Sequence, residues 1–155
     1  MDKTQVKNFI ESLREEIIFY YLNDEEVETI LPYFEIKEYP ENTVIFREGD
    51  SGDFIGFVIS GKLEVKKQTE FKGNQIILAI LGKGATVGEL SMFDKHSRSA
   101  TVETIEPTKL LILRQDAIED IMNNHPPIAI KLLKALVRIL SIRLRKLSER
   151  LTTIF

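Results

Sequence analysis

The chain has 155 residues, of which 43% are hydrophobic and 29% charged, the composition of one soluble globular domain with a real core. It has no cysteine, which excludes disulfides, iron–sulfur clusters and thiolate zinc sites. The net charge of −3 is unevenly spread: residues 131–155 carry seven Lys/Arg against one Asp/Glu, and the other 130 residues carry 14 against 23. The basic residues of this end either lie in solvent on the outer face of a helix, which we favour, or bind an acidic partner or nucleic acid.

The first sixteen residues are charged throughout and contain no apolar signal region. The longest uninterrupted apolar runs, residues 17–22 and 76–81, are far too short to span a bilayer. We therefore expect a cytoplasmic protein that does not cross a membrane.

The N-terminal part, residues 1–33, reads as two helices. Residues 4–21 are expected to form an amphipathic helix, because apolar residues recur at helical spacing at Val6, Phe9, Ile10, Leu13 and Ile17. Asn23 or Asp24 then caps a second, short helix that ends near Pro32.

From Phe34 to about residue 114 the pattern changes to short alternating stretches separated by glycine and proline. After a first strand that begins at Phe34, the candidate strands are residues 43–46, 54–60, 62–68, 75–81, 99–105 and 109–113. Many short strands with such turns predict a closed or double-layered antiparallel architecture, and with the helices an α+β, mainly β, fold.

Residues 87–102 contain the candidate ligand-binding residues. They follow a loop with two glycines and begin with a third, Gly88, and the next five residues could form one helical turn whose free N–H groups bind an anion. Arg98 follows nine residues after Glu89, and a guanidinium grips a phosphate through two parallel hydrogen bonds. A carboxylate beside it can accept hydrogen bonds from a sugar hydroxyl, so the segment predicts a nucleotide pocket.

Residues 88–92 (GELSM) and 98–102 (RSATV) resemble the two ends of the phosphate-binding cassette of cyclic nucleotide-binding domains. That family includes catabolite activator/Fnr-type regulators, cyclic-nucleotide-gated channels and kinase regulatory subunits. The resemblance implies that Glu89 binds the ribose 2′-hydroxyl, that Arg98 binds the cyclic phosphate and that Ser99 adds a hydrogen bond to it. The binding residues implied within the cassette are Gly88, Glu89, Leu90, Ser91, Arg98, Ser99, Ala100 and Thr101.

Residues 45–50 and 57–65 are similar to the β-roll of the same family, so the resemblance covers about residues 22–150. It implies an antiparallel, jelly-roll-like β-roll (a double-stranded β-helix) over residues 34–114, flanked by N-terminal helices and a long C-terminal helix. The implied ligand is a cyclic nucleotide, cyclic AMP first and cyclic GMP as the alternative, because the residue after the cassette arginine is compatible with both.

The last part, residues 115–155, is expected to hold a hinge and a long terminal helix. Asp116 with Glu119 fits a capping box, so a helix should start there and reach about Asn123, before residues 124–127 break it. The final helix carries a coiled-coil seam at Leu133, Val137, Leu140, Leu144, Leu147 and Leu151. We favour a parallel homodimer through this seam over one broad face buried within a monomer.

In the family the terminal helix moves, and the resemblance implies that nucleotide binding docks it as a lid about a hinge near residues 123–127. Arg143 on this helix either contacts the base, as an arginine does in some channel-like members, or faces solvent.

The chain therefore reads as a single cyclic nucleotide-binding domain, a non-enzymatic, stand-alone sensor that signals to an unknown protein effector. Its sequence has no room for a helix-turn-helix after the last helix, so we expect no DNA-binding domain. The alternatives are the sensory fragment of a longer transcriptional regulator and a dimerisation module that binds no ligand. Only His96 and His125 are available as histidine ligands, and they form no His-x-His pattern, so neither a metal nor catalysis is expected.

Overall fold

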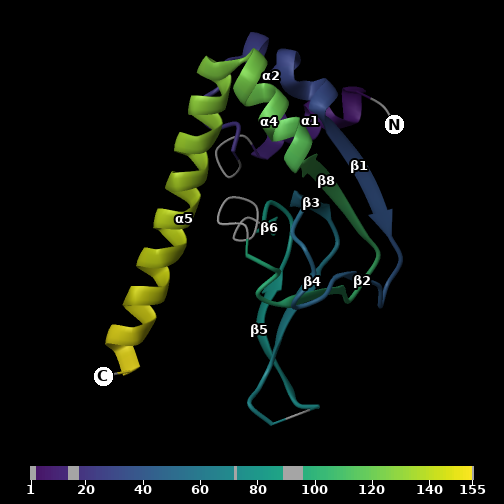
Figure 1. Ribbon diagram of the computed structural model, residues 1–155, viewed down its shortest axis with the longest axis vertical. Helices are drawn as coiled ribbons and strands as arrows, with labels where there is room; N and C mark the ends of the chain where they lie inside the picture. Colours follow the sequence, from purple (N-terminus) through teal and green to yellow (C-terminus); the bar gives the residue numbers. More distant parts are fainter. Residues whose placement is uncertain (1–2, 14–17, 72, 89–95, 155) are drawn as a thin grey trace.

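The computed structural model describes residues 3–13, 18–71, 73–88 and 96–154. Its centre is a roll of eight antiparallel strands in two four-stranded sheets (Figure 1). The first sheet has the order β1 (Phe34–Tyr39), β8 (Thr108–Arg114), β3 (Phe54–Ser60) and β6 (Thr86–Val87). The second has the order β2 (Val44–Phe46), β7 (Thr101–Thr104), β4 (Leu63–Gln68) and β5 (Gln75–Leu81). This confirms the predicted α+β fold with an antiparallel β-roll.

Strand β8 lies between β1 and β3 and contributes to two separate cores. Because side chains alternate along a strand, Leu110 and Ile112 face the interior of the roll, whereas Leu111 and Leu113 face the helices. The interior core also contains Phe46, Val58, Leu63, Val87 and Val102. The helix-side core is larger and joins the first sheet to residues of all the described α-helices.

The first N-terminal helix ends earlier than expected. The described part of α1 spans Lys3–Leu13, and residues 18–21 form a turn, so the helix expected over residues 4–21 was too long. Phe19 explains the turn, because it is fully buried in the helix-side core and its ring contacts that of Phe34 in a tilted arrangement, with 5.1 Å between ring centroids. The second helix, α2 (Asp24–Ile30), starts at the predicted Asn23 cap, where Glu26 completes a capping box, and the 3₁₀ turn η1 (Leu31–Tyr33) follows it.

The chain passes directly from β8 into α4 (Gln115–Asn124), and here the predicted capping box was wrong. Arg114 takes the N-cap position without a side-chain hydrogen bond, and Asp116 lies inside the first turn. The reason is the neighbouring loop, since the N–H of Gln115 donates to the carbonyl of Asp53 at 2.9 Å. A tertiary contact thus satisfies a helix-terminal donor that a side chain was expected to cap.

The last helix, α5 (Pro126–Ile154), begins at the predicted proline, next to the other helices (Figure 1). It then extends beyond them along one side of the molecule. Its first half is anchored: Ile128, Ala129, Leu132, Ala135, Leu136 and Ile139 are buried in the helix-side core. Three polar contacts on the N-terminal segment strengthen this anchor, namely Lys131 with Glu26, Lys134 over the ring of Tyr21 and Arg138 over the ring of Tyr20. Beyond Ile139 no described residue of α5 is buried.

Among the described residues, α5 and β5 each expose a row of apolar side chains. On α5 the predicted seam residues Leu133, Val137, Leu144, Leu147 and Leu151 are all exposed, up to 67% at Leu144, whereas Leu140 packs partly on the core. On the edge strand β5, Ile76, Leu78 and Ile80 are each about half exposed. None of the described helices is both long and apolar enough to cross a membrane.

Candidate functional site

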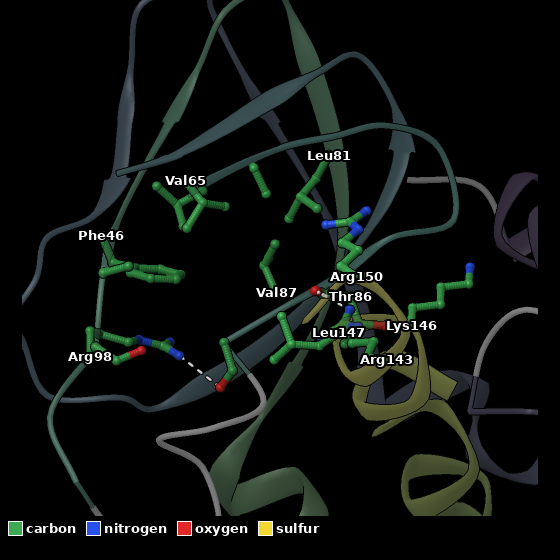
Figure 2. A pocket seen from close by; sticks show the side chains of 15 residues that line it. Phe46, Val65, Leu81, Thr86, Val87, Arg98, Arg143, Lys146, Leu147 and Arg150 are labelled. Atoms are coloured by element: carbon green, nitrogen blue, oxygen red, sulfur yellow. Dashed lines mark hydrogen bonds between the residues drawn. The ribbon is translucent and has the colours of Figure 1, made fainter. Parts of the chain in front are cut away.

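A cavity of about 440 Å³ lies between the roll and the second half of α5 (Figure 2). Its apolar wall comes from both sheets and consists of Phe46, Val65, Ala79, Leu81, Val87 and Val102. Its polar side chains are Thr86, Arg98 and Ser99 from the roll and Arg143, Lys146 and Arg150 from α5. The size and the apolar wall with few polar groups are typical of a small-molecule site.

Arg98 is the buried charge of this cavity, with only 2% of its surface exposed. Its Nη1 donates to the carbonyl of Gly88 and its Nη2 to the carbonyl of Phe54, each at 2.9 Å. The guanidinium also lies over the rings of Phe46 and Phe54, 4.1 and 4.8 Å from their centroids. These four contacts hold a permanent positive charge in one place at the end of the cavity.

Gly88 makes this arrangement possible. Its φ of +83° is a conformation that residues with side chains rarely adopt. A Cβ atom there would lie 2.9 Å from the carbonyl oxygen of Phe54 and 3.2 Å from Cζ of Arg98, with Nη1 closer still. The missing side chain of Gly88 therefore leaves the space that the guanidinium fills.

The backbone around Arg98 is pinned to the loop between β2 and β3. The N–H of Arg98 donates to the carbonyl of Asp50 at 2.7 Å, and the carbonyl of Arg98 accepts from the N–H of Gly49 at 2.8 Å. The hydroxyl oxygen of Thr101 accepts from the N–H of Glu48 at 2.9 Å. Two segments more than forty-five residues apart in sequence thus fix the arginine's backbone.

The structure brings five of the nine predicted site residues together at the cavity: Gly88, Arg98, Ser99, Ala100 and Arg143. Thr101 differs from the expectation. Strand alternation puts Ala100 and Val102 on the cavity side, whereas Thr101 is buried on the other side, where it holds the backbone of Glu48. The remaining three, Glu89, Leu90 and Ser91, lie outside the described residues.

On the α5 side, Nη2 of Arg143 donates to the carbonyl of Thr86 at 2.8 Å, a contact drawn in Figure 2. This answers one question that the sequence left open, since Arg143 lies against β6 rather than in solvent. Lys146 and Arg150, which were not predicted as site residues, line the cavity with it, and so does Leu147, which was predicted only as a residue of the seam. Their spacing of three, four and seven residues from Arg143 puts them on the same helix face, and that signal was available.

At the junction of α4 and α5, Tyr33 connects the N-terminal helices to both elements. Its ring meets that of His125 edge-on at 6.2 Å between centroids. A hydrogen bond to Asp120 raises the pKa of the Tyr33 hydroxyl above its ordinary value. In the part of the chain that the structure describes, no group of three or more His, Cys, Asp or Glu residues could hold a metal ion.

A comparison with protein families identifies the domain. A family model described as the cyclic nucleotide-binding domain matches residues 36–125, which include the whole cassette segment. The chain belongs to this family. The family expected from the two ends of the cassette is thereby confirmed.

Individual relatives of this cyclic nucleotide-binding domain extend the match. The cyclic AMP receptor protein of Thermus thermophilus is 36% identical over 121 residues, which cover 78% of this chain and 56% of the relative. The CRP-like cAMP-activated global transcriptional regulator of Mycobacterium tuberculosis is 31% identical over 114 residues, covering 74% of this chain and 49% of the relative. The chain thus spans about half the length of these relatives.

Among solved structures, a cyclic nucleotide-binding domain from Methylobacillus flagellatus superposes with a TM-score of 0.83 at 29% identity. The superposition covers 96% of this chain and 85% of that one. The similarity therefore includes the helices that precede and follow the roll in the sequence as well as the roll itself.

Proposed function

We propose that this domain is a non-enzymatic sensor that binds a 3′,5′-cyclic nucleoside monophosphate in the cavity between the roll and α5. The observation that carries the proposal is the buried guanidinium of Arg98, fixed at one end of the cavity by two carbonyls and two aromatic rings. A guanidinium matches a phosphate through two parallel hydrogen bonds, and an apolar surrounding strengthens the attraction of opposite charges. The names of the two relatives, both of which specify cyclic AMP, support a cyclic nucleotide as the ligand.

Each predicted cassette residue except Thr101 has a role in this proposal. Arg98 neutralises the cyclic phosphate, while Ser99, Ala100 and the glycine turn at Gly88 supply hydrogen bonds beside it. Glu89 is proposed to accept a hydrogen bond from the ribose 2′-hydroxyl, and the backbone N–H groups of Leu90 and Ser91 are proposed to donate to the phosphate. Arg143, which lines the cavity on the α5 side, is proposed to lie near the base.

Signalling in this proposal depends on α5. A ligand that touches both the roll and the second half of α5 favours the docked helix by as much as it binds that state more tightly. Two partners are proposed to respond: a second copy of the chain, through the exposed stripe of α5, and a protein effector. In the alternative proposal the effector is a further domain of a longer transcriptional regulator, since the relatives are about twice as long. A cytoplasmic location belongs to the same proposal.

The direct test is calorimetric titration of the nucleotide-stripped protein with cyclic AMP and with cyclic GMP, repeated on Arg98→Ala. We expect the substitution to weaken binding by about 2–5 kcal/mol, because it removes one partner of a buried charge pair. Arg98→Lys keeps the charge but loses the paired hydrogen bonds, so a smaller loss is expected. Arg145→Ala, an exposed arginine outside the cavity, is the matched control and should bind like the unaltered protein.

Two outcomes would contradict the proposal. If folded Arg98→Ala protein bound as well as the unaltered chain, the phosphate would lie elsewhere. If the folded, unaltered protein bound neither cyclic nucleotide, the dimerisation module without a ligand would be the better description.

A further inference from the structure

Strand β5 forms an exposed edge of the roll. Among the described strands it pairs only with β4, so part of its backbone N–H and C=O groups point away from the sheet. Natural edge strands usually carry lysine or proline, which discourages pairing with another chain. Residues 75–81 (QIILAIL) contain no charged residue and no proline. Ile76, Ile77, Leu78 and Ile80 are each more than half exposed, so the edge is open to a further strand.

The hairpin of β4 and β5 projects from the roll at the end of the molecule opposite α1, α2 and α4 (Figure 1). The β4–β5 ladder shifts register beside Leu78, which leaves three residues regularly paired with β4 on each side of the shift. An extended peptide can add to an exposed edge of this kind, since main-chain hydrogen bonds give affinity and alternate side chains give specificity. The surroundings of the two faces of β5 therefore determine which peptide fits.

One face of this edge lies on the side of α5. Val65 of β4 lines the cavity, and α5 forms the opposite wall, which includes Lys146. Lys67 follows Val65 by two residues, so it lies on the same face of the sheet, beside its register partner Ile76. Residues 140–154 of α5 carry four Lys/Arg against one Asp/Glu. A strand added beside β5 would thus have every second side chain on a positively charged side.

The opposite face is apolar at β5 and compensated in charge next to it. Ile77 and Ile80 lie on this face, because their register partners on β4 are Lys66 and Glu64. Lys66 forms ion pairs with both Glu64 and Glu103, so its charge is already matched. A strand added beside β5 would contact Ile77 and Ile80 here, which favours apolar side chains.

We propose that β5 binds an extended segment of a protein partner in which acidic and apolar residues alternate. The segment adds a strand to the sheet, with its carboxylates on the side of Lys67 and Lys146 and its apolar side chains beside Ile77 and Ile80. Charge complementarity favours the acidic residues, and the alternation of a strand sets their spacing. The inference goes beyond the proposed function, because pairing at this edge requires no nucleotide.

The test uses the nucleotide-stripped full chain and labelled synthetic peptides of about eight residues, the length of one strand. One peptide alternates glutamate and valine, a second alternates lysine and valine, and a third has the composition of the first with all glutamates at one end. Fluorescence anisotropy measures the affinities. We expect the alternating glutamate peptide to bind about tenfold more tightly than either of the others. It should also slow hydrogen–deuterium exchange in residues 75–81.

The substitution Ile77→Lys separates strand pairing from a general attraction between charges. It removes an apolar contact and introduces the residue that protects natural edges, so the alternating glutamate peptide should bind about two- to fivefold more weakly. Ile130→Lys on α5 is the matched control, since Ile77 and Ile130 are 59% and 58% exposed, and it should bind like the unaltered chain. Attraction between charges alone would make Ile77→Lys bind this peptide more tightly, and that result would overturn the proposal.

The substitution Lys67→Glu tests the charged side of the edge. It should weaken binding of the alternating glutamate peptide and strengthen that of the lysine peptide, so that the preference between them falls about threefold to tenfold. Lys37→Glu makes the same change at an exposed lysine of β1, in the other sheet, and should leave the preference as it is. An unchanged preference in Lys67→Glu would overturn the proposal that acidic residues lie on this side.

Other occupants of the edge give distinct results. Absence of binding of the alternating glutamate peptide to the folded chain, or equal binding of both charge types, would overturn the proposal. If residues 75–81 were protected from exchange without peptide and lost this protection on dilution, a second copy of the chain would cover the edge instead. Cyclic nucleotide binding is measured separately by calorimetry, so either proposal can fail while the other stands.

Discussion

Gly88 and Arg98 act as one unit in the cavity wall. The turn at Gly88, with its φ of +83°, gives the arginine room, and the carbonyl of the same residue accepts from Nη1. On the other side the aromatic rings of Phe46 and Phe54 cover the guanidinium. A phosphate would therefore bind an arginine whose position is already fixed. Binding would then cost little free energy for ordering this side chain.

The glycine can be tested by Gly88→Ala. The added Cβ would displace the guanidinium and strain the backbone, the latter by about 1–2 kcal/mol. We expect the melting temperature to fall by about 2–8 °C and cyclic nucleotide binding to weaken about tenfold or more, equivalent to 1.4 kcal/mol. Differential scanning fluorimetry and calorimetric titration measure the two effects.

Gly73→Ala is the matched control, because Gly73 has a similar φ of +88° but no atom within 4 Å of an added Cβ. It should show the backbone strain alone and keep full affinity. If both variants lost binding equally, the close approach of Gly88 to Arg98 would not explain the effect.

At the scale of single residues, the sequence predicted Arg98 and its neighbours better than the other residues that line the cavity. Arg98 could be identified because cassette motifs have a fixed order, and the structure puts it in the cavity with Ser99 and Ala100. Thr101 could not be placed, since the end of a strand one residue earlier or later reverses which side chains face inward. Lys146 and Arg150 were missed although their spacing puts them on the helix face of Arg143, because the spacing alone does not show that another element covers that face.

Helix α5 consists of two parts with different support. Residues up to Ile139 are buried against the other helices and tied to the N-terminal segment by Lys131, Lys134 and Arg138. Residues after it touch the roll chiefly across the cavity, through Arg143 and its neighbours on the same face. A ligand in the cavity would thus act on the second part, while the first part transmits any change to α4.

Hydrogen–deuterium exchange can test this division. With saturating cyclic nucleotide we expect slower exchange within residues 123–150, and the largest protection after Ile139, because that part gains contacts through the ligand. The buried first part should change less. The measurement is peptide-resolved exchange with and without nucleotide.

Arg98→Ala serves as the control, because it should show no protection at the same nucleotide concentration. Unchanged exchange across residues 123–150 in the unaltered protein, at a concentration shown to saturate it, would contradict a lid role for α5.

At the scale of elements, alternation and turn residues predicted strands and Pro126 predicted the start of α5, because these signals are local. Strand β6 was missed, since two residues, Thr86 and Val87, are too few to show a period and pair only with β3. The predicted capping box at Asp116 was wrong because the backbone of Asp53 accepts from the first N–H of α4. The predicted length of α1 was wrong because Phe19 is buried in the core from a turn.

On the scale of the whole molecule, the exposed stripe of α5 is the main unexplained surface. Val137 and Leu144, which lie one heptad apart in the seam, are 62% and 67% exposed. Monomeric proteins seldom leave such a row of apolar side chains uncovered. A second copy can cover it by the same stripe, since a two-fold axis brings identical surfaces together. We therefore expect a homodimer in solution.

Light scattering after gel filtration tests the dimer. The unaltered chain should have about twice the 17.8 kDa mass of one copy, and Val137→Glu combined with Leu144→Glu should have the mass of one copy, because buried unpaired carboxylates are costly. Arg145→Gln, next to the stripe but outside its heptad positions, should remain dimeric. An unaltered protein that stays monomeric at every concentration would contradict the interface.

The position of β8 has a consequence for how the molecule comes apart. One strand supplies Leu110 and Ile112 to the inside of the roll and Leu111 and Leu113 to the helices, so neither half can melt while the other keeps its strand. Unfolding should therefore be a single cooperative event rather than two. A nucleotide that binds only the folded roll would then protect the distant helices from heat as well, since the free energy of binding is shared by everything that must unfold together.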